Sequence, residues 1–150
     1  KNGREEEWNR GILMTNNTED RIAVQDVMLR YAATVDDKDY DGYRALFVED
    51  VKVVGMGADE MNGMEVFYPW WKAAIDKYDA TQHMLSPTFA TISGDSAKTR
   101  TDVQATHYPK GDSVTTITLW ATYHTDMRRV DNEWKICRHE LVSRGLQKLP

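Results

Sequence analysis

The stretch IAVQDVMLRYAATVDDKDYDGYRALF, residues 22–47, decides how the fold begins. Apolar residues recur in it at three- and four-residue steps as far as Val35, which predicts an amphipathic helix ending there. Acidic residues and a lysine then interrupt the pattern. It resumes in DYDGYRALF, which predicts a second, short helix with Asp39 as its cap. Asp36 is left at the end of the first helix, where its carboxylate belongs either to a solvated turn or to a cavity.

The rest of the chain changes from helical periodicity to alternation. VKVVG predicts a short strand over 51–55, and GMEVFYPWWKAAIDKY predicts a third helix over 63–78. After residue 78 the chain alternates with period two and is rich in β-branched residues, and hairpin-sized turns divide it. The runs are 80–92, 96–108, 114–130 and 133–144. Helices followed by a strand meander predict an α+β fold with antiparallel neighbours.

Composition excludes several classes of function. The formal net charge is −5 and no basic stripe is present, so we expect no nucleic-acid partner. No apolar run approaches the length of a membrane span, so we expect no membrane partner. The single cysteine, Cys137, and the lack of an export signal favour the cytoplasm. The glycine-containing stretch 55–63 matches no phosphate-binding loop, so no nucleotide cofactor is indicated.

The chain length of 150 residues is typical of one domain. We interpret residues 1–17 as a polar N-terminal extension, either foreign to the domain or disordered, and residues 18–150 as the domain. Asn17 and Thr18 are candidate caps of the first helix.

Strand alternation assigns faces to the histidines. His107 falls with Val103 and Ala105 on the apolar face of its strand, and His83 falls on the less polar face of the run 80–92. His124 falls on the outward face, and the alternation leaves the role of His139 open. Taken alone, each inward histidine is more often a satisfied core residue than a catalyst, and the aromatic residues at 67–78 are more often core than a binding site.

The sequence as a whole resembles the SnoaL-like family of the nuclear-transport-factor-2-like superfold. The resemblance rests on residues 22–51, on GMEVFYPW, on ATQHMLSPTFATISGDSAKTRTDVQATH and on HTDMRRVDNEWKICRHEL, and covers about residues 19–144. It implies an α+β cone-shaped barrel, in which a curved antiparallel sheet wraps around about three N-terminal helices and encloses one pocket. Members of this kind work without a cofactor, so the resemblance implies neither a cofactor nor a metal.

Within the superfold, the pattern is most similar to that of scytalone dehydratase and related dehydratases. DDKDY, TQH and ATH match its catalytic Asp and two His, which implies catalytic roles for Asp36, His83 and His107. A bile-acid dehydratase resembles the chain through Tyr31, five residues before Asp36. The implied substrate-binding residues are Tyr31, Val54, Phe67, Trp71, Leu119 and Tyr123.

The chain also departs from those relatives. Val35 and Val54 stand where scytalone dehydratase has tyrosines, and Ala121 and Tyr123 stand where it has a polar pair. Arg144 misses by one residue the arginine of the bile-acid and dehydrochlorinase families, which would reverse its face. The reaction class therefore stays open between dehydration, isomerisation and another elimination.

Three functions follow. The first is a cofactor-independent lyase or isomerase that acts on a small, largely apolar carbonyl or ring compound. In it, an Asp36–His83 pair supplies the base and His107 donates to a substrate oxygen. The second is a non-catalytic ligand-binding or assembly module, like the small subunit of aromatic-ring dioxygenases. The third, ranked low, is a metal site made by the same three residues. We also expect a homo-oligomer, a dimer or trimer, formed through the sheet face that carries Trp120.

Overall fold

The computed structural model describes residues 2–150, with side chains from Thr18 onward. Helices dominate the first half of the chain and strands dominate the second. The elements are α1 (Asn2–Asp36), α2 (Tyr40–Ala45), β1 (Phe47–Met56), β2 (Ala58–Asn62), α3 (Met64–Ile75), β3 (Tyr78–Leu85), β4 (Phe89–Ser93), β5 (Ser96–Pro109), β6 (Thr116–Val130) and β7 (Glu133–Leu149).

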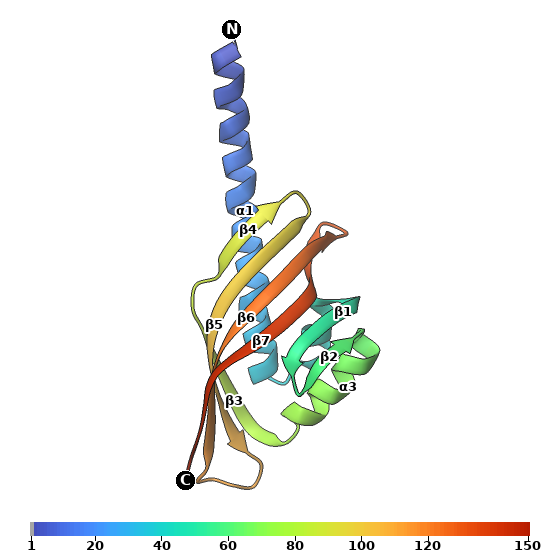
Figure 1. Cartoon of the computed structure of the whole chain (residues 1–150), viewed down its shortest axis with the longest axis vertical. Helices are drawn as coiled ribbons and strands as arrows, with labels where there is room; N and C mark the ends of the chain where they lie inside the picture. The colour runs from blue at the N-terminus through green and yellow to red at the C-terminus, as the bar shows by residue number, and fades with distance from the viewer. Residues whose placement is uncertain (1) are drawn as a thin grey trace.

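The strands form one sheet in the order β2-β1-β7-β6-β5-β3, and β4 also pairs with β5. Neighbours are antiparallel except β1 and β7, which run parallel. Figure 1 shows the long strands β5, β6 and β7 curving across the C-terminal part of α1, with α3 beside β1 and β2. The predicted α+β fold, a curved sheet combined with three helices, is confirmed, and the sheet stays open.

The largest differences from the predicted elements concern α1, β2 and the run 80–92. Helix α1 begins at Asn2, well before Thr18, and the intervening residues contain no proline that would stop it. Strand β2 was not predicted, because its sequence ADEMN has little β-propensity and forms a strand by pairing with β1. The run 80–92 divides into β3 and β4 around Pro87, which has no N–H to donate to a ladder.

The core lies between the inner face of the sheet and the apolar faces of α1 and α3. In β5 the predicted alternation is confirmed, since Val103 and Ala105 are buried while Gln104 between them is exposed. Aromatic rings fill the region between the helices: Tyr43 stacks on Trp71 with ring centroids 3.6 Å apart, and Phe67 is fully buried beside them. Such rings stabilise the packing of α2 against α3 because they bury a large apolar area and because the rings attract each other.

The outer face of the sheet carries Trp120, which is 37% exposed. Leu146, on the neighbouring strand β7, is 69% exposed. The exposure of Trp120 agrees with the predicted outward face, and the homo-oligomer stays a prediction. None of the helices in the described residues is long and apolar enough to cross a membrane.

His139, whose role the sequence left open, is a core residue of β7. It is fully buried, its Nδ1 lies 2.9 Å from the hydroxyl of Thr125, and its Nε2 has no hydrogen-bond partner among the described residues. The rings of Tyr31 and Tyr123 pack on it at 4.9 and 4.6 Å between centroids. Burial, with a smaller contribution from Arg138, lowers the pKa of His139 to about 3, so this histidine is neutral in the folded protein.

The buried His139 predicts a pH dependence of stability. Its folded pKa lies below the ordinary value of 6.5, so the unfolded chain binds more protons between those values. The free energy of unfolding should therefore fall as pH drops from 6.5 toward 3, with a slope of up to about 1.4 kcal/mol per pH unit from this group. Urea unfolding across this range should show a shallower slope for His139→Leu and an unchanged slope for Thr125→Val. Equal slopes for the wild type and His139→Leu would contradict the assignment.

Candidate active site

The carboxylate of Asp36 is held by the three residues Thr81, Gln82 and His83 of β3. The Thr81 hydroxyl donates to Oδ1 at 2.9 Å and the Gln82 side-chain amide donates to Oδ2 at 3.2 Å. The backbone N–H of His83 donates to Oδ2 at 2.8 Å, and its Nδ1 lies 2.7 Å from Oδ1. The last residue of α1 is therefore bound by the whole TQH sequence, and the predicted Asp36–His83 contact is present.

These hydrogen bonds determine the charge of Asp36. Partial burial pushes its pKa up, but the hydrogen bonds from the ring and backbone of His83 and from Thr81 outweigh that effect, and the net pKa is lowered from 3.8. Asp36 is therefore a carboxylate at neutral pH. A carboxylate only accepts hydrogen bonds, so the 2.7 Å contact requires the proton on Nδ1 of His83. In the neutral form of this ring, Nε2 carries no proton.

The turn after α1 fixes where Asp36 points. The N–H of Asp39 bonds to the carbonyl of Thr34, and the N–H of Lys38 bonds to the carbonyl of Val35, which is the pattern of a Schellman cap. Lys38 occupies the left-handed position of that cap with φ 55°, where glycine is usual. Its ammonium donates to the Tyr78 carbonyl at 2.6 Å. The same turn that ends α1 thus ties the start of β3 next to it.

His107 lies beside His83 on the neighbouring strand β5. Register pairs Thr81 with His107, and the two imidazole rings are 5.7 Å apart between centroids and nearly perpendicular. The Tyr78 ring packs on the other side of His107 at 4.7 Å. Burial, followed by the neighbouring His83, lowers the pKa of His107 below 6.5, so His107 is neutral at neutral pH.

The tautomer of His107 follows from its backbone contact. Its Nδ1 lies 3.3 Å from the carbonyl oxygen of Ile117, and a carbonyl oxygen can only accept. This contact is a hydrogen bond when Nδ1 carries the proton, and Nε2 of the neutral ring is then an acceptor. The predicted role of His107 as a donor to a substrate oxygen would need a protonated ring.

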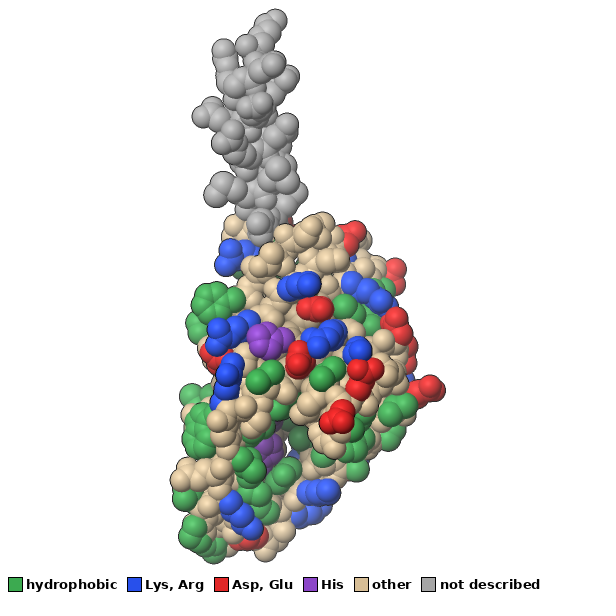
Figure 2. All heavy atoms as spheres, viewed as in Figure 1, with side chains coloured by type: hydrophobic (Ala, Val, Ile, Leu, Met, Phe, Trp, Pro, Cys, Tyr) green, Lys and Arg blue, Asp and Glu red, His purple; other side chains and the backbone are tan. Residues whose placement is uncertain are grey.

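A cavity of about 150 Å³ lies against the two histidines. Most of its wall is apolar or aromatic. The lining residues are Tyr31, Val35, Met56, Trp70, Trp71, Ala74, Ile75, Tyr78, His83, Ala105, His107, Leu119, Tyr123 and Leu141. Figure 2 shows a hollow in the lower part of the molecule, with hydrophobic side chains at its rim and histidine atoms inside. Burial raises the pKa of both Tyr31 and Tyr123 well above 10, so their phenols keep their protons.

Most of the predicted site residues meet at this cavity. His83, His107, Tyr31, Trp71, Leu119 and Tyr123 line it. Asp36 contacts His83 from behind and is not part of the wall.

Three other residues lie away from the cavity. Phe67 packs into the core against Tyr43 and Phe47, and Val54 lies one residue past the buried Val53 and pairs with Glu60 and Glu140. The Arg144 guanidinium binds the Thr122 hydroxyl at 3.2 Å instead of lining the cavity.

Met56 is the residue of β1 that lines the cavity, where the sequence had predicted Val54. The two glycines on either side of Met56 explain the difference. Gly55 and Gly57 have φ of +73° and +72°, a conformation that glycine adopts without strain. A side chain on Gly57 would overlap Trp70, another wall residue, and one on Gly55 would overlap the Leu141 carbonyl. The GMG sequence thus breaks the alternation of β1 and brings Met56 to the cavity. The two glycines are the sequence signal for this wall.

The proposed metal site finds no support in the geometry. Both oxygens of Asp36 already accept hydrogen bonds from β3. Within the described residues, no group of three His, Cys, Asp or Glu side chains is arranged to hold a metal ion.

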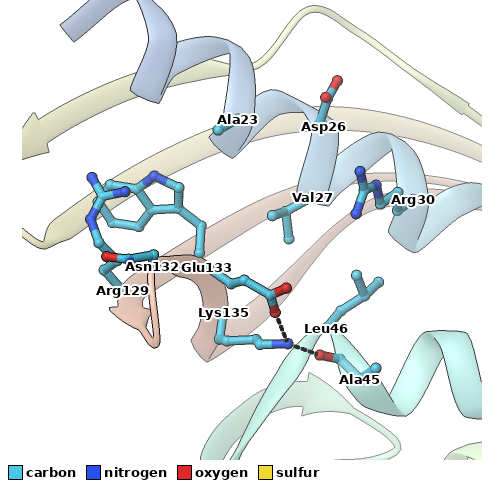
Figure 3. A pocket seen from close by; sticks show the side chains of 11 residues that line it. Ala23, Asp26, Val27, Arg30, Ala45, Leu46, Arg129, Asn132, Glu133 and Lys135 are labelled. Atoms are coloured by element: carbon cyan, nitrogen blue, oxygen red, sulfur yellow. Dashed lines mark hydrogen bonds and ion pairs between the residues drawn. The ribbon is translucent and has the colours of Figure 1, made fainter. Parts of the chain in front are cut away.

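A second, more open groove of about 320 Å³ lies between α1, the end of α2 and the β6–β7 turn (Figure 3). Two of its basic side chains, Lys135 and Arg129, are paired with acidic groups. Lys135 bonds to Glu133 at 2.8 Å and to the Ala45 carbonyl at 2.7 Å, and Arg129 bonds to Asp20 at 2.7 Å. No histidine lines this groove. These pairs fasten α1 and α2 to the hairpin, and the groove lacks the acid–base groups of the cavity.

Thr81→Val tests the clamp on Asp36, because it removes one donor while keeping the shape of the side chain. The lowered pKa of Asp36 contributes stability above its ordinary value of 3.8, and that contribution is lost as pH falls through the folded pKa. The variant should unfold with about 1–2 kcal/mol less free energy at neutral pH. The deficit should shrink under acidic conditions. Urea unfolding at neutral and acidic pH measures the loss of unfolding free energy under both conditions. A loss that does not depend on pH would show that Thr81 acts through packing alone.

Comparison with known proteins places this geometry in context. Among curated sequences, an uncharacterised protein of Mycobacterium tuberculosis is 22% identical over 133 residues, covering 86% of this chain and 88% of that one.

Two solved structures show the same fold. A provisionally named scytalone dehydratase from Novosphingobium aromaticivorans has a TM-score of 0.83 at 24% identity, over 89% of this chain and 90% of that one. A hexachlorocyclohexane dehydrochlorinase from Novosphingobium barchaimii has a TM-score of 0.77 at 17% identity, over 90% of this chain and 93% of that one. The family model described as the SnoaL-like domain matches residues 16–140. The chain belongs to the SnoaL-like family.

Proposed function

We propose that the protein is a cofactor-independent lyase or isomerase in which His83, oriented by Asp36, removes a proton from a small, largely apolar ring or carbonyl compound. The observation that carries the proposal is the 2.7 Å Asp36–His83 contact directly beside an apolar cavity. The solved structures of similar fold include proteins named as a dehydratase and as a dehydrochlorinase, and both names denote eliminations.

The Asp36–His83 pair suits proton abstraction from carbon. Asp36 holds the His83 proton on Nδ1, which leaves Nε2 available as the base. When Nε2 takes a proton, the carboxylate stabilises the resulting imidazolium. The His83 side chain is only 7% exposed, so bulk water competes little for the base.

The remaining steps can be completed by groups of the cavity. The electron pair of the broken C–H bond moves toward the adjacent carbonyl. The phenols of Tyr31 and Tyr123 line the cavity and keep their protons, which supports a role for them as donors to the developing enolate. In a dehydration, His83 then passes its proton to the leaving hydroxyl, and water departs as the new double bond forms. In an isomerisation, His83 returns the proton to a different carbon. The enzyme ends unchanged in both cases.

A non-catalytic binding or assembly module is the alternative. A pocket filled by aromatic side chains would favour this alternative. Here, about 150 Å³ stays open next to the two histidines. An ionised carboxylate fixed on a ring nitrogen is also an expensive feature for a purely structural core. Both observations favour catalysis.

Asp36→Asn tests the proposal. The amide keeps the shape of the side chain but cannot stabilise an imidazolium, and its NH₂ group competes for the Nδ1 contact. On a substrate found by screening cyclic ketones and hydroxyketones, kcat should fall by about 10²–10⁴-fold. The kcat of His83→Gln should fall by at least as large a factor.

Asp39→Asn is the matched control, since Asp39 caps α2 through the Gly42 N–H and does not touch His83. It should keep nearly full activity. Wild-type turnover in Asp36→Asn, with circular dichroism unchanged, would contradict the role of the pair.

A further inference from the structure

We propose that the cavity selects a neutral molecule of one ring that carries a hydroxyl group, and that this hydroxyl donates to Nε2 of His107. The inference rests on the proposed function, because it names the ligand class of the same site. It is argued from the size, charge and hydrogen-bonding capacity of the cavity.

Size limits the ligand to about one ring. The open volume is about 150 Å³, and an apolar protein cavity of about that size holds one benzene molecule. The aromatic side chains Trp70, Trp71 and Tyr78 form much of the wall, and Trp71 is held by its stack on Tyr43. A fused two-ring ligand would need these rings to move.

Charge limits the ligand to a neutral form. The residues that line the cavity, all within the described part of the chain, include no Lys, Arg, Asp or Glu. An anion would be buried without a counter-ion and close to the Asp36 carboxylate, which is costly. A cation would lose its water without direct contact with an acidic side chain, because Asp36 lies behind His83 and does not line the cavity.

The tautomers of the histidines add a requirement for a donor. Nδ1 of His83 contacts Asp36 and Nδ1 of His107 contacts the Ile117 carbonyl, and both partners are acceptors, so the neutral form of either ring leaves Nε2 without a proton. His83 uses its Nε2 as the base in the proposed reaction. His107 stays neutral because its pKa is lowered, and the Tyr78 ring packs against it. A hydroxyl is the small neutral group that satisfies such an acceptor, and a ligand without one leaves it unpaired in an apolar site.

Binding of inert probes tests the inference without any turnover. Isothermal titration calorimetry on the full chain near neutral pH would compare five probes: phenol, anisole, benzoate, benzylammonium and 2-naphthol. Phenol should bind best. Anisole, which has the same ring but no donor, should bind roughly tenfold or more weaker. Benzoate and benzylammonium test charge, 2-naphthol tests size, and each should bind more weakly than phenol.

Two variants test whether His107 causes the preference for phenol over anisole. His107→Phe removes the acceptor and keeps an aromatic ring. The affinity for phenol should therefore fall to the affinity for anisole, and the affinity for anisole should change little. His124→Phe is the matched control, because His124 is on β6 between the inward-facing Tyr123 and Thr125 and does not line the cavity. It should keep the phenol-to-anisole ratio of the wild type. Circular dichroism would verify that both variants fold.

Several outcomes would overturn the ligand class. These are equal binding of anisole and phenol, tighter binding of a charged probe or of 2-naphthol, no binding of phenol at millimolar concentration, or an unchanged ratio in His107→Phe. Loss of selectivity therefore contradicts this inference, whereas full activity of Asp36→Asn contradicts the proposed function.

Discussion

The site and the fold both depend on the hydrogen bonds that β3 makes to the carboxylate of Asp36. They join the end of α1 to residues that lie 45 to 47 positions later in the chain. The same strand pairs with β5 so that Thr81 is opposite His107 and His83 is opposite Ala105. The hydrogen bonds to Asp36 thus position the helix against the sheet and hold the ring of His83, and the β3–β5 pairing brings the second histidine next to it. Loss of Asp36 should therefore affect packing and chemistry together.

Local patterns, together with the resemblance to dehydratases of the superfold, predicted which side chains meet at the cavity. Asp36 was marked by the end of a helical pattern, and His83 and His107 were marked by strand alternation and by the TQH and ATH sequences. Each of these signals depends on the residue and its immediate neighbours. The structure brings the three side chains together because β3 and β5 are adjacent strands, as antiparallel strands close in sequence commonly are.

The opposite wall of the cavity could not be predicted in this way. Strand alternation alone, applied to β1, does not place Met56 at the cavity, because glycines with positive φ on either side of it shift the phase. Arg144 lies where the pairing of β6 with β7 shifts by one residue, between Gly145 opposite Trp120 and Ser143 opposite Ala121. Such shifts depend on contacts with other strands. The tautomer of His107 likewise depends on the Ile117 carbonyl of β6, which no pattern within β5 reveals.

The parallel pairing of β1 with β7 has a consequence for how the protein acquires its binding site. Met56 of β1 and Leu141 of β7 both line the cavity, yet these strands lie at opposite ends of the sheet-forming sequence. Contacts between distant segments form late, since closing a long loop is slow. On a ribosome, the β3–β5 and β5–β6 ladders can assemble while β7 is still being synthesised, but the cavity cannot close. A small ligand that fits the cavity would therefore bind only chains in which β7 has been made, and would draw newly made protein toward the folded state.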